Sequence, residues 1–151
     1  MIDPIVRVAD RGDRDELIWL EGQSRAAVSA QRGGELWLER HPAQSPDWDS
    51  VAAGCVLVAT LDEVVVGYLR HEHVDGVLHV HDVYVHPQAR ELGFGDALLD
   101  AAIEVGRRES AHRIEAEALP GDRDTKNLYE RAGITAKRIT VSSRLDDLGE
   151  R

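Results

Sequence analysis

The stretch Val83–Leu99, VYVHPQARELGFGDALL, joins a strand to a helix through a turn that contains two glycines. Alternating valines at Val83 and Val85 are typical of a buried strand, and Pro87 ends it. Gly93 and Gly95 stand where the turn becomes the first turn of the helix. Glycines there let backbone N–H groups approach an anion without a Cβ atom in the way, and the helix dipole adds about half a positive charge. The stretch therefore predicts a pyrophosphate-binding turn.

This turn differs from the two commonest phosphate-binding turns. No Gly-Lys-Ser/Thr follows it, and Leu98 stands where a dinucleotide fingerprint has its third glycine. Arg90-x-x-Gly93-x-Gly95 resembles instead the acyl-CoA loop of the GCN5-related N-acetyltransferases, Arg/Gln-x-x-Gly-x-Gly/Ala, although Glu91 replaces one further glycine of that loop. The resemblance implies that seven consecutive residues hold the pyrophosphate of acetyl-CoA through backbone amides: Arg90, Glu91, Leu92, Gly93, Phe94, Gly95 and Asp96.

The same resemblance extends to the strand before the turn and to a later segment. It implies that the strand bulges and that backbone groups at Val83 and Val85 hold the pantetheine arm and face the thioester carbonyl. Asp122–Gly133, DRDTKNLYERAG, resembles the second cofactor segment of the family, with Asp122 in place of an asparagine and Lys126 in the same helix. Tyr129 then corresponds to the tyrosine that protonates the leaving thiolate, since a phenol with a pKa of about 10 can act as an acid at neutral pH. The alternative, a helix tyrosine that only packs on the core, stays open.

Five of the seven histidines fall between residues 71 and 86. Asp75-Gly76 between two alternating runs predicts a hairpin. It would pair Val74 with Val77, Glu72 with His79, and Arg70 with His81. Alternation then puts His79, His81, Val83 and Val85 on one face and Asp82 on the other, unless a bulge shifts the register.

The His-x-His pair before this strand end resembles that of the serotonin (arylalkylamine) N-acetyltransferases. The resemblance implies that His79 and His81 lie on the acceptor side and help to deprotonate the amine. Neutral imidazole suits this role, because its ordinary pKa is about 6.5. Three alternatives stay open: the histidines are only surface residues, Glu115 or Glu117 is the base, or ordered water takes the proton. We expect no metal site, because no further ligand is placed to complete one.

Composition sets the class of protein. The chain has 151 residues, 30% of them charged, with a net charge of −10, which argues against nucleic acid as a partner. Residues 1–82 carry 15 acidic and 7 basic side chains, whereas residues 83–151 carry 13 and 11. No apolar run approaches a membrane span, the N-terminus lacks the apolar core of a signal peptide, and Cys55 is the single cysteine. We therefore expect a cytoplasmic protein without disulfides or membrane contact.

Hydrophobic periodicity predicts one domain over residues 1–151, with the element order β-α-α-β-β-β-α-β-α-β. This is the order of the acetyltransferases, an α/β fold with a central mixed sheet flanked by helices. The predicted strands are Ile5–Val8, Gly54–Thr60, Val64–His73, Val77–Val85, His112–Ala118 and Ile134–Leu145. The predicted helices are Arg14–Glu21, a broken stretch Gln23–Arg40, Asp96–Glu109 and Asp122–Ala132.

Together these patterns predict an N-acetyltransferase that moves an acetyl group from acetyl-CoA to a primary amine by direct attack in a ternary complex. The acceptor would be a small molecule or a peptide. Two other classes stay open: a non-catalytic acyl-CoA-binding domain, and an interaction protein that keeps only the scaffold. A homodimer formed through sheet edges is one possibility.

Overall fold

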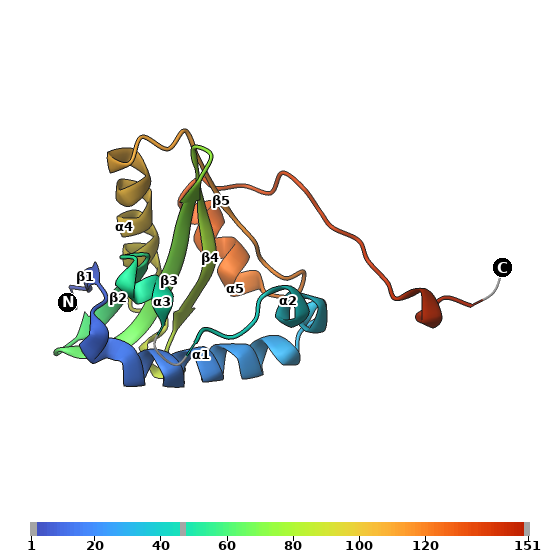
Figure 1. The fold of residues 1–151 in the computed structure, drawn as a ribbon, viewed down its shortest axis with the longest axis horizontal. Coiled ribbons are helices and arrows are strands. Elements are labelled where there is room, and N and C mark those ends of the chain that lie inside the picture. Colours follow the sequence, from blue (N-terminus) through green and yellow to red (C-terminus); the bar gives the residue numbers. More distant parts are fainter. Residues whose placement is uncertain (1–2, 46–47, 150–151) are drawn as a thin grey trace.

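The computed structural model describes residues 3–45 and 48–149 of the chain (Figure 1). Its five strands are β1 (Ile5–Val8), β2 (Val56–Leu61), β3 (Val64–Val74), β4 (Val77–Val85) and β5 (Arg113–Ala116). Its α-helices are α1 (Arg14–Ser29), α2 (Gly34–Arg40), α3 (Asp49–Ala52), α4 (Phe94–Arg108) and α5 (Arg123–Arg131). Short 3-10 turns are found at Arg11–Asp13, Pro87–Ala89 and Leu145–Asp147.

The strands form one mixed sheet in the order β1-β2-β3-β4-β5. Neighbouring strands are antiparallel except β4 and β5, which are parallel. Because parallel strands need a crossover connection, α4 links β4 to β5 across one face of the sheet. The predicted α/β class and mixed sheet are confirmed. The Asp75-Gly76 hairpin is confirmed as well, with Val74 opposite Val77.

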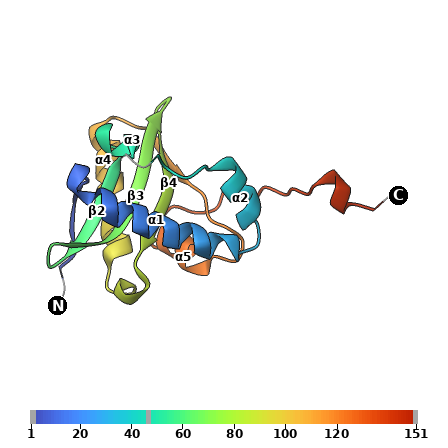
Figure 2. The ribbon, with the colours of Figure 1, turned by 60° about the horizontal axis from the view of Figure 1, so that its bottom comes forward.

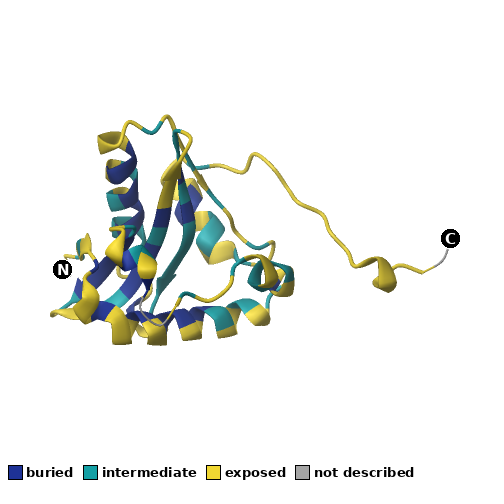
Figure 3. Cartoon of the chain, in the orientation of Figure 1, coloured by how far each residue is buried: buried dark blue, intermediate teal, exposed yellow. Residues whose placement is uncertain are grey.

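Helices cover both faces of the sheet (Figures 1 and 2). On one face α4 and α5 pack against Leu57, Leu69 and Leu78 through side chains such as Leu98 and Leu128. On the other face α1 buries Leu17 and Leu20 with a second set of core residues: Trp48, Val56, Val58 and Tyr68. Figure 3 shows the buried residues lining these two interfaces. Among the described residues, no helix is both long enough and apolar enough to span a membrane.

A β-bulge changes the faces of β4. Arg70 lies opposite Asp82 and His71 lies opposite Val80, so His81 is an extra residue in the ladder. Leu78 and Val80 pack on the α4 side, and beyond the bulge Val83 and Val85 pack on that side too.

The bulge that the resemblance implied is thus present, and two predictions about this strand are wrong. His81 does not pair with Arg70, because the extra residue moves Asp82 into that place. His79 does not share a face with Val83 and Val85, because the same extra residue reverses the alternation after His81.

The C-terminal segment departs from its predicted structure. Residues 135–144 are extended but form no ladder with any strand that the structure describes, so the predicted strand Ile134–Leu145 is wrong. A strand is held by hydrogen bonds to a neighbour, and this segment runs away from the sheet (Figure 1). The helix predictions differ mainly in length: α1 continues to Ser29, and the break falls at Gly33, whose φ is +83°.

Candidate active site

A gap opens between β4 and β5. The two strands pair only from Val77 opposite Arg113 to Val80 opposite Ala116, where β5 ends, while β4 continues to Val85. In the described part of the chain, β4 therefore has no strand neighbour on that side beyond Val80. Helix α5 packs beside α4 on the same core through Leu128 and Tyr129.

Backbone groups of β4 point into this gap. The amide of His86 donates to the carbonyl of Val66 over 2.7 Å, which extends the β3–β4 ladder by one pair. Since alternate residues of an antiparallel strand bond to the same neighbour, the N–H and C=O of Val83 and Val85 face away from β3. Arg90 Nε donates to the Val85 carbonyl over 3.1 Å and ties the following turn to the end of β4. The backbone groups of the two valines thus point toward the gap, where the Val85 carbonyl already accepts from Arg90. Their contact with a pantetheine arm stays a prediction.

The glycine turn ends at the N-terminus of α4. Glu91 and Gly93 have φ values of +65° and +88°, and the first helical hydrogen bond runs from the Ala97 amide to the Gly93 carbonyl. The amides of Phe94, Gly95 and Asp96 precede that bond, so they have no carbonyl partner within the helix. No side chain among the described residues caps this end. The turn therefore presents backbone amides of the kind that bind anions at helix N-termini.

Side chains of the turn have separate structural roles. Phe94 is fully buried in the core, so only its backbone is available to a ligand. A Cβ atom on Gly95 would lie 3.5 Å from Leu128 of α5, an ordinary contact. Glu91 occupies a left-handed conformation that favours glycine. The turn therefore keeps this backbone geometry although Glu91 stands in place of the further glycine found in the acyl-CoA loop.

Arg131 is a cation near the turn that the sequence analysis missed. Its Nε donates to Asp96 Oδ1 over 3.1 Å, which joins the last turn of α5 to the first turn of α4. The pair lies 35 residues apart in the chain, and no local pattern connects them. Arg90 is the second cation here, with its guanidinium 5.3 Å from the centre of the Tyr84 ring.

Asp122 and Lys126, both predicted to bind the cofactor, have partners within the protein. Asp122 caps α5 by accepting from the Thr125 amide over 3.1 Å and from the Thr125 hydroxyl over 2.6 Å. Lys126 Nζ donates to the Pro120 carbonyl over 3.0 Å. Both lie at the N-terminal end of α5, while Arg131 contacts the glycine turn from the other end. The structure therefore does not bring Asp122 and Lys126 together with the turn.

Tyr129 is buried, with 6% of its surface exposed. Burial raises the pKa of its hydroxyl well above the ordinary value, and the carboxylates of Asp82, Asp122 and Glu117 raise it further. These carboxylates come from β4, the loop before α5 and the segment after β5, which border the gap. The phenol therefore stays protonated at neutral pH.

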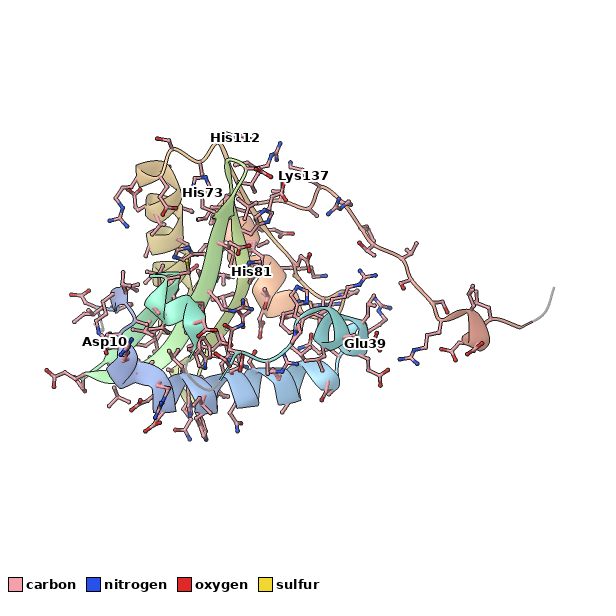
Figure 4. All side chains as sticks on the ribbon, viewed as in Figure 1. Asp10, Glu39, His73, His81, His112 and Lys137 are labelled. Carbon is pink, nitrogen blue, oxygen red and sulfur yellow. The ribbon has the colours of Figure 1, made fainter. Side chains whose placement is uncertain are left out.

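The paired histidines lie on the sheet face opposite α4. His79 is opposite Glu72 of β3 and Glu115 of β5, and its ring stacks on that of His81 with centroids 6.2 Å apart. His81 Nε2 is 3.5 Å from Glu72. Burial lowers the pKa of His81, and Arg70 lowers it further, against the opposing effect of Glu72. Figure 4 shows His81 about midway along the sheet, whereas His73 lies toward the hairpin end.

Two acids, the partly buried Asp82 and the buried Glu21, extend this face toward α1. Asp82 accepts from the Tyr68 hydroxyl over 2.8 Å and from Arg70 Nε over 3.0 Å, so its carboxylate is engaged on both oxygens. Glu21 of α1 is 8% exposed and accepts from the Gln44 amide over 3.1 Å. Burial raises the pKa of Glu21. The sequence analysis missed Glu21, although its place four residues after Leu17 puts it on the buried face of α1.

The alternative bases and the cysteine are also placed. Glu115 shares the face of His79 and is exposed, and Glu117 is exposed just beyond the end of β5. Burial raises the pKa of the Cys55 thiol, which makes it a poor nucleophile. Among the described residues, no group of three or more histidines, cysteines and acids is arranged to hold a metal.

Comparison with known proteins identifies the class. The sequence profile of the Acetyltransferase (GNAT) family matches residues 16–134, and the chain belongs to this family. A search of curated protein sequences found no match. Residues predicted as the acyl-CoA turn and the second cofactor segment both fall within the matched range.

Solved structures share the fold at low sequence identity. The aminoglycoside N-acetyltransferase AAC(6')-Iy with a bisubstrate analogue of CoA and acetylneamine is 14% identical over 94% of this chain and 97% of that one, with a TM-score of 0.69. The PaiA N-acetyltransferase of Thermoplasma acidophilum with coenzyme A is 13% identical over 87% and 89%, with a TM-score of 0.71. An aminoglycoside acetyltransferase from an uncultured soil metagenomic sample, solved with sisomicin, is 14% identical over 93% and 94%, with a TM-score of 0.68.

Proposed function

We propose that this protein transfers an acetyl group from acetyl-CoA to a primary amine, by direct attack of the amine in a ternary complex. The observation that carries the proposal is the gap between β4 and β5. On that side β4 is unpaired beyond Val80, and the free amides at the start of α4 follow it in the chain. Tyr129 packs on the same core as Val83 and Val85. A cofactor with a charged diphosphate, an extended amide-bearing arm and a terminal thioester fits that sequence of groups.

The donor side is assigned as follows. The amides of residues 93–96 bind the diphosphate, with Arg131 and Arg90 as nearby cations. The inward backbone groups of Val83 and Val85 hold the pantetheine arm, and an amide there polarises the thioester carbonyl.

Tyr129 donates to the sulfur as the C–S bond breaks. The leaving thiolate, whose conjugate thiol has a pKa of about 8.5, is a weaker base than tyrosinate. The Tyr129 hydroxyl therefore stabilises the thiolate mainly by donating a hydrogen bond to it.

The acceptor side uses His81 with His79. An amine that arrives as an ammonium ion must lose a proton before its nitrogen attacks the carbonyl carbon and forms the C–N bond. The lowered pKa of His81 keeps its ring neutral at pH 7, so it can accept that proton directly or through water. Asp82 is bonded to Tyr68 and Arg70, which leaves it less suited to the task. Glu115 and Glu117 are the next candidates.

The acceptor we infer carries more than one positive charge. On this face of the sheet Arg70 is paired with Asp82 and Arg113 with Glu115. Glu72 beside the histidine pair and Glu21 on α1 have no lysine or arginine side chain bonded to them among the described residues. Opposite charge at a binding face speeds association and disfavours anionic competitors. The aminoglycosides bound by two of the solved relatives are polyamines of this kind.

Calorimetry combined with a thiol-release assay tests the proposal. We expect wild-type protein to bind acetyl-CoA and to release thiol with at least one member of a panel of monoamines and polyamines. Binding without release on any amine would favour a non-catalytic acyl-CoA-binding domain. If acetyl-CoA and CoA both fail to bind, the protein keeps only the scaffold and the proposal is wrong.

A further inference from the structure

A pocket of about 390 Å³ lies between the N-terminal half of α1 and the adjoining ends of β3 and β4. His86, at its β4 end, follows His81 by five residues, roughly 15 Å of extended chain, so the pocket is separate from the histidine face assigned to the acceptor. We call it the Trp19 pocket. Its lining residues are Asp15, Glu16, Trp19, Leu20, Val64, Val65 and His86.

An exposed aromatic ring forms one wall of the Trp19 pocket. Trp19 is 50% exposed, and its ring stacks on that of His86 with centroids 5.2 Å apart and an angle of 15° between the planes. His86 is itself held, because its Nδ1 accepts from the Gln88 amide over 3.0 Å. The stack fixes the indole ring and leaves half of the residue open to a ligand. The face of an indole ring attracts cations within about 6 Å of its centre.

The floor of the pocket is apolar. Leu20 is 1% exposed, and Val65 packs on the same core as Leu20. A hydrated inorganic ion would gain nothing from such a floor, whereas alkyl groups would lose contact with water there. The floor therefore favours a ligand that carries hydrocarbon.

Carboxylates make the pocket negative. Glu16 and Asp15 precede Trp19 by three and four residues, so they lie on the same side of α1 as the indole ring. Asp15 lies 3.9 Å from Arg14 in an exposed pair, whereas Glu16 has no hydrogen bond or ion pair among the described residues. No lysine or arginine lines the pocket. This charge disfavours an anion and favours a cation.

We propose that the Trp19 pocket binds the alkylammonium group of a small molecule. The positive charge lies between the Glu16 carboxylate and the indole face, and the alkyl groups lie against Leu20 and Val65. A fixed aromatic face, an apolar floor and an unpaired carboxylate together match that chemistry and no simpler ion. Binding here needs neither acetyl-CoA nor acetyl transfer, so it stands or falls separately from the proposed reaction.

A titration of the protein without acetyl-CoA gives the first test, with choline as the probe. The neutral comparison is 3,3-dimethyl-1-butanol, which has the same shape and no charge. The chain has three tryptophans, and the indole N–H signal of each can be followed by NMR. Choline should shift the Trp19 signal along a saturable curve in the millimolar range and leave those of Trp37 and Trp48 in place. The neutral alcohol should bind at least about fivefold more weakly.

Two pairs of variants assign the binding to its groups, with the backbone amide of Val65 as the signal. Trp19→Leu keeps an apolar side chain and should weaken choline binding about threefold to tenfold. Trp37→Leu is its control, because it removes the other tryptophan that stacks on a histidine. Glu16→Gln should weaken binding about twofold to fivefold, whereas Asp100→Asn removes an exposed charge from α4 and should have no effect.

Three results would overturn the proposal. The first is equal affinity for choline and its neutral analogue, which would leave only a hydrophobic contact. The second is wild-type affinity in Trp19→Leu. The third is a Trp19 shift that sodium chloride reproduces at the same concentration, because that would be screening of surface charge without a bound ligand.

Discussion

Arg70 and Asp82 lie opposite each other in the β3–β4 ladder and join through an ion pair of 3.0 Å between Nε and Oδ1. Their alignment depends on the extra residue at His81, which turns Asp82 toward the α1 side of the sheet. There Asp82 also accepts from the Tyr68 hydroxyl. The pair therefore places a fixed positive charge next to the imidazole that we propose as the base, and Arg70 lowers the pKa of His81.

This relationship predicts the pH dependence of the reaction. The rate should rise with pH through an apparent pKa below the ordinary 6.5 of histidine, because burial and Arg70 both disfavour the protonated ring of His81. Arg70→Met removes one of these effects and frees the Asp82 carboxylate, so the limb should move to higher pH. The measurement is kcat/KM from pH 5 to pH 9.

Two variants serve as controls for that profile. His81→Gln should remove the limb, whereas His79→Gln should slow turnover and leave a limb in place. A double variant that retains the wild-type limb would exclude both histidines and direct attention to Glu115 or Glu117. An amine that titrates near pH 9 to 10 adds a separate, higher limb.

Tyr129→Phe should lower turnover by about 10² to 10⁴ with little change in acetyl-CoA affinity, since it removes only the hydroxyl. Tyr84→Phe is the matched control, because it deletes a hydroxyl from a ring that contacts Arg90 on the other side of β4. Single-turnover kinetics would report the chemical step. Equal rates for the two variants would mean that Tyr129 only packs.

The two glycines of the turn should respond differently to alanine. Gly93 has a φ of +88°, so Gly93→Ala is expected to lower the free energy of unfolding by about 1–2 kcal/mol and to weaken CoA binding. Gly95→Ala meets Leu128 at 3.5 Å without backbone strain, so the free energy of unfolding should be kept. Its Cβ atom lies beside the amides that we propose bind the diphosphate, so CoA binding should weaken. Urea unfolding and calorimetry check the pair. Unchanged CoA affinity in Gly95→Ala would place the diphosphate away from residue 95.

Glu91 offers a gain instead of a loss. Glu91→Ala removes a carboxylate beside the diphosphate site, and Glu91→Gly removes it and also relieves the φ of +65°. Both should lower KM for acetyl-CoA, and the glycine variant should be the more stable of the two by up to about 1 kcal/mol. If the carboxylate faces away from the cofactor, KM will not change in either variant.

His71 predicts a pH-dependent stability. It is 4% exposed, and neither ring nitrogen has a hydrogen-bond partner among the described residues. Burial lowers its pKa in the folded protein, so the unfolded chain binds the proton first as pH falls below about 6.5. The free energy of unfolding should therefore decrease below that pH, by at most about 1.4 kcal/mol per pH unit from this group. His71→Leu should flatten the slope between pH 7 and pH 5 in urea unfolding; an unchanged slope would contradict this origin.

Features that depend on short-range geometry could be predicted from the sequence. Asp75-Gly76 specifies a tight turn, so the β3–β4 hairpin follows. Gly93 supplies the left-handed residue from which α4 starts, and the periodicity of Leu98 and its neighbours determines which side of that helix is buried. These features made the family fold and the glycine turn before α4 predictable.

Features that need a partner from elsewhere in the chain became visible only in the folded protein. The bulge at His81 reverses every later side chain of β4, and no local pattern marks it, because apolar residues occur on both sides of that strand. The contact between Arg131 and Asp96 requires α5 to pack beside α4. Residues 135–145 have the alternation of a strand but pair with no strand that the structure describes. A strand forms only where a neighbouring strand edge receives its hydrogen bonds.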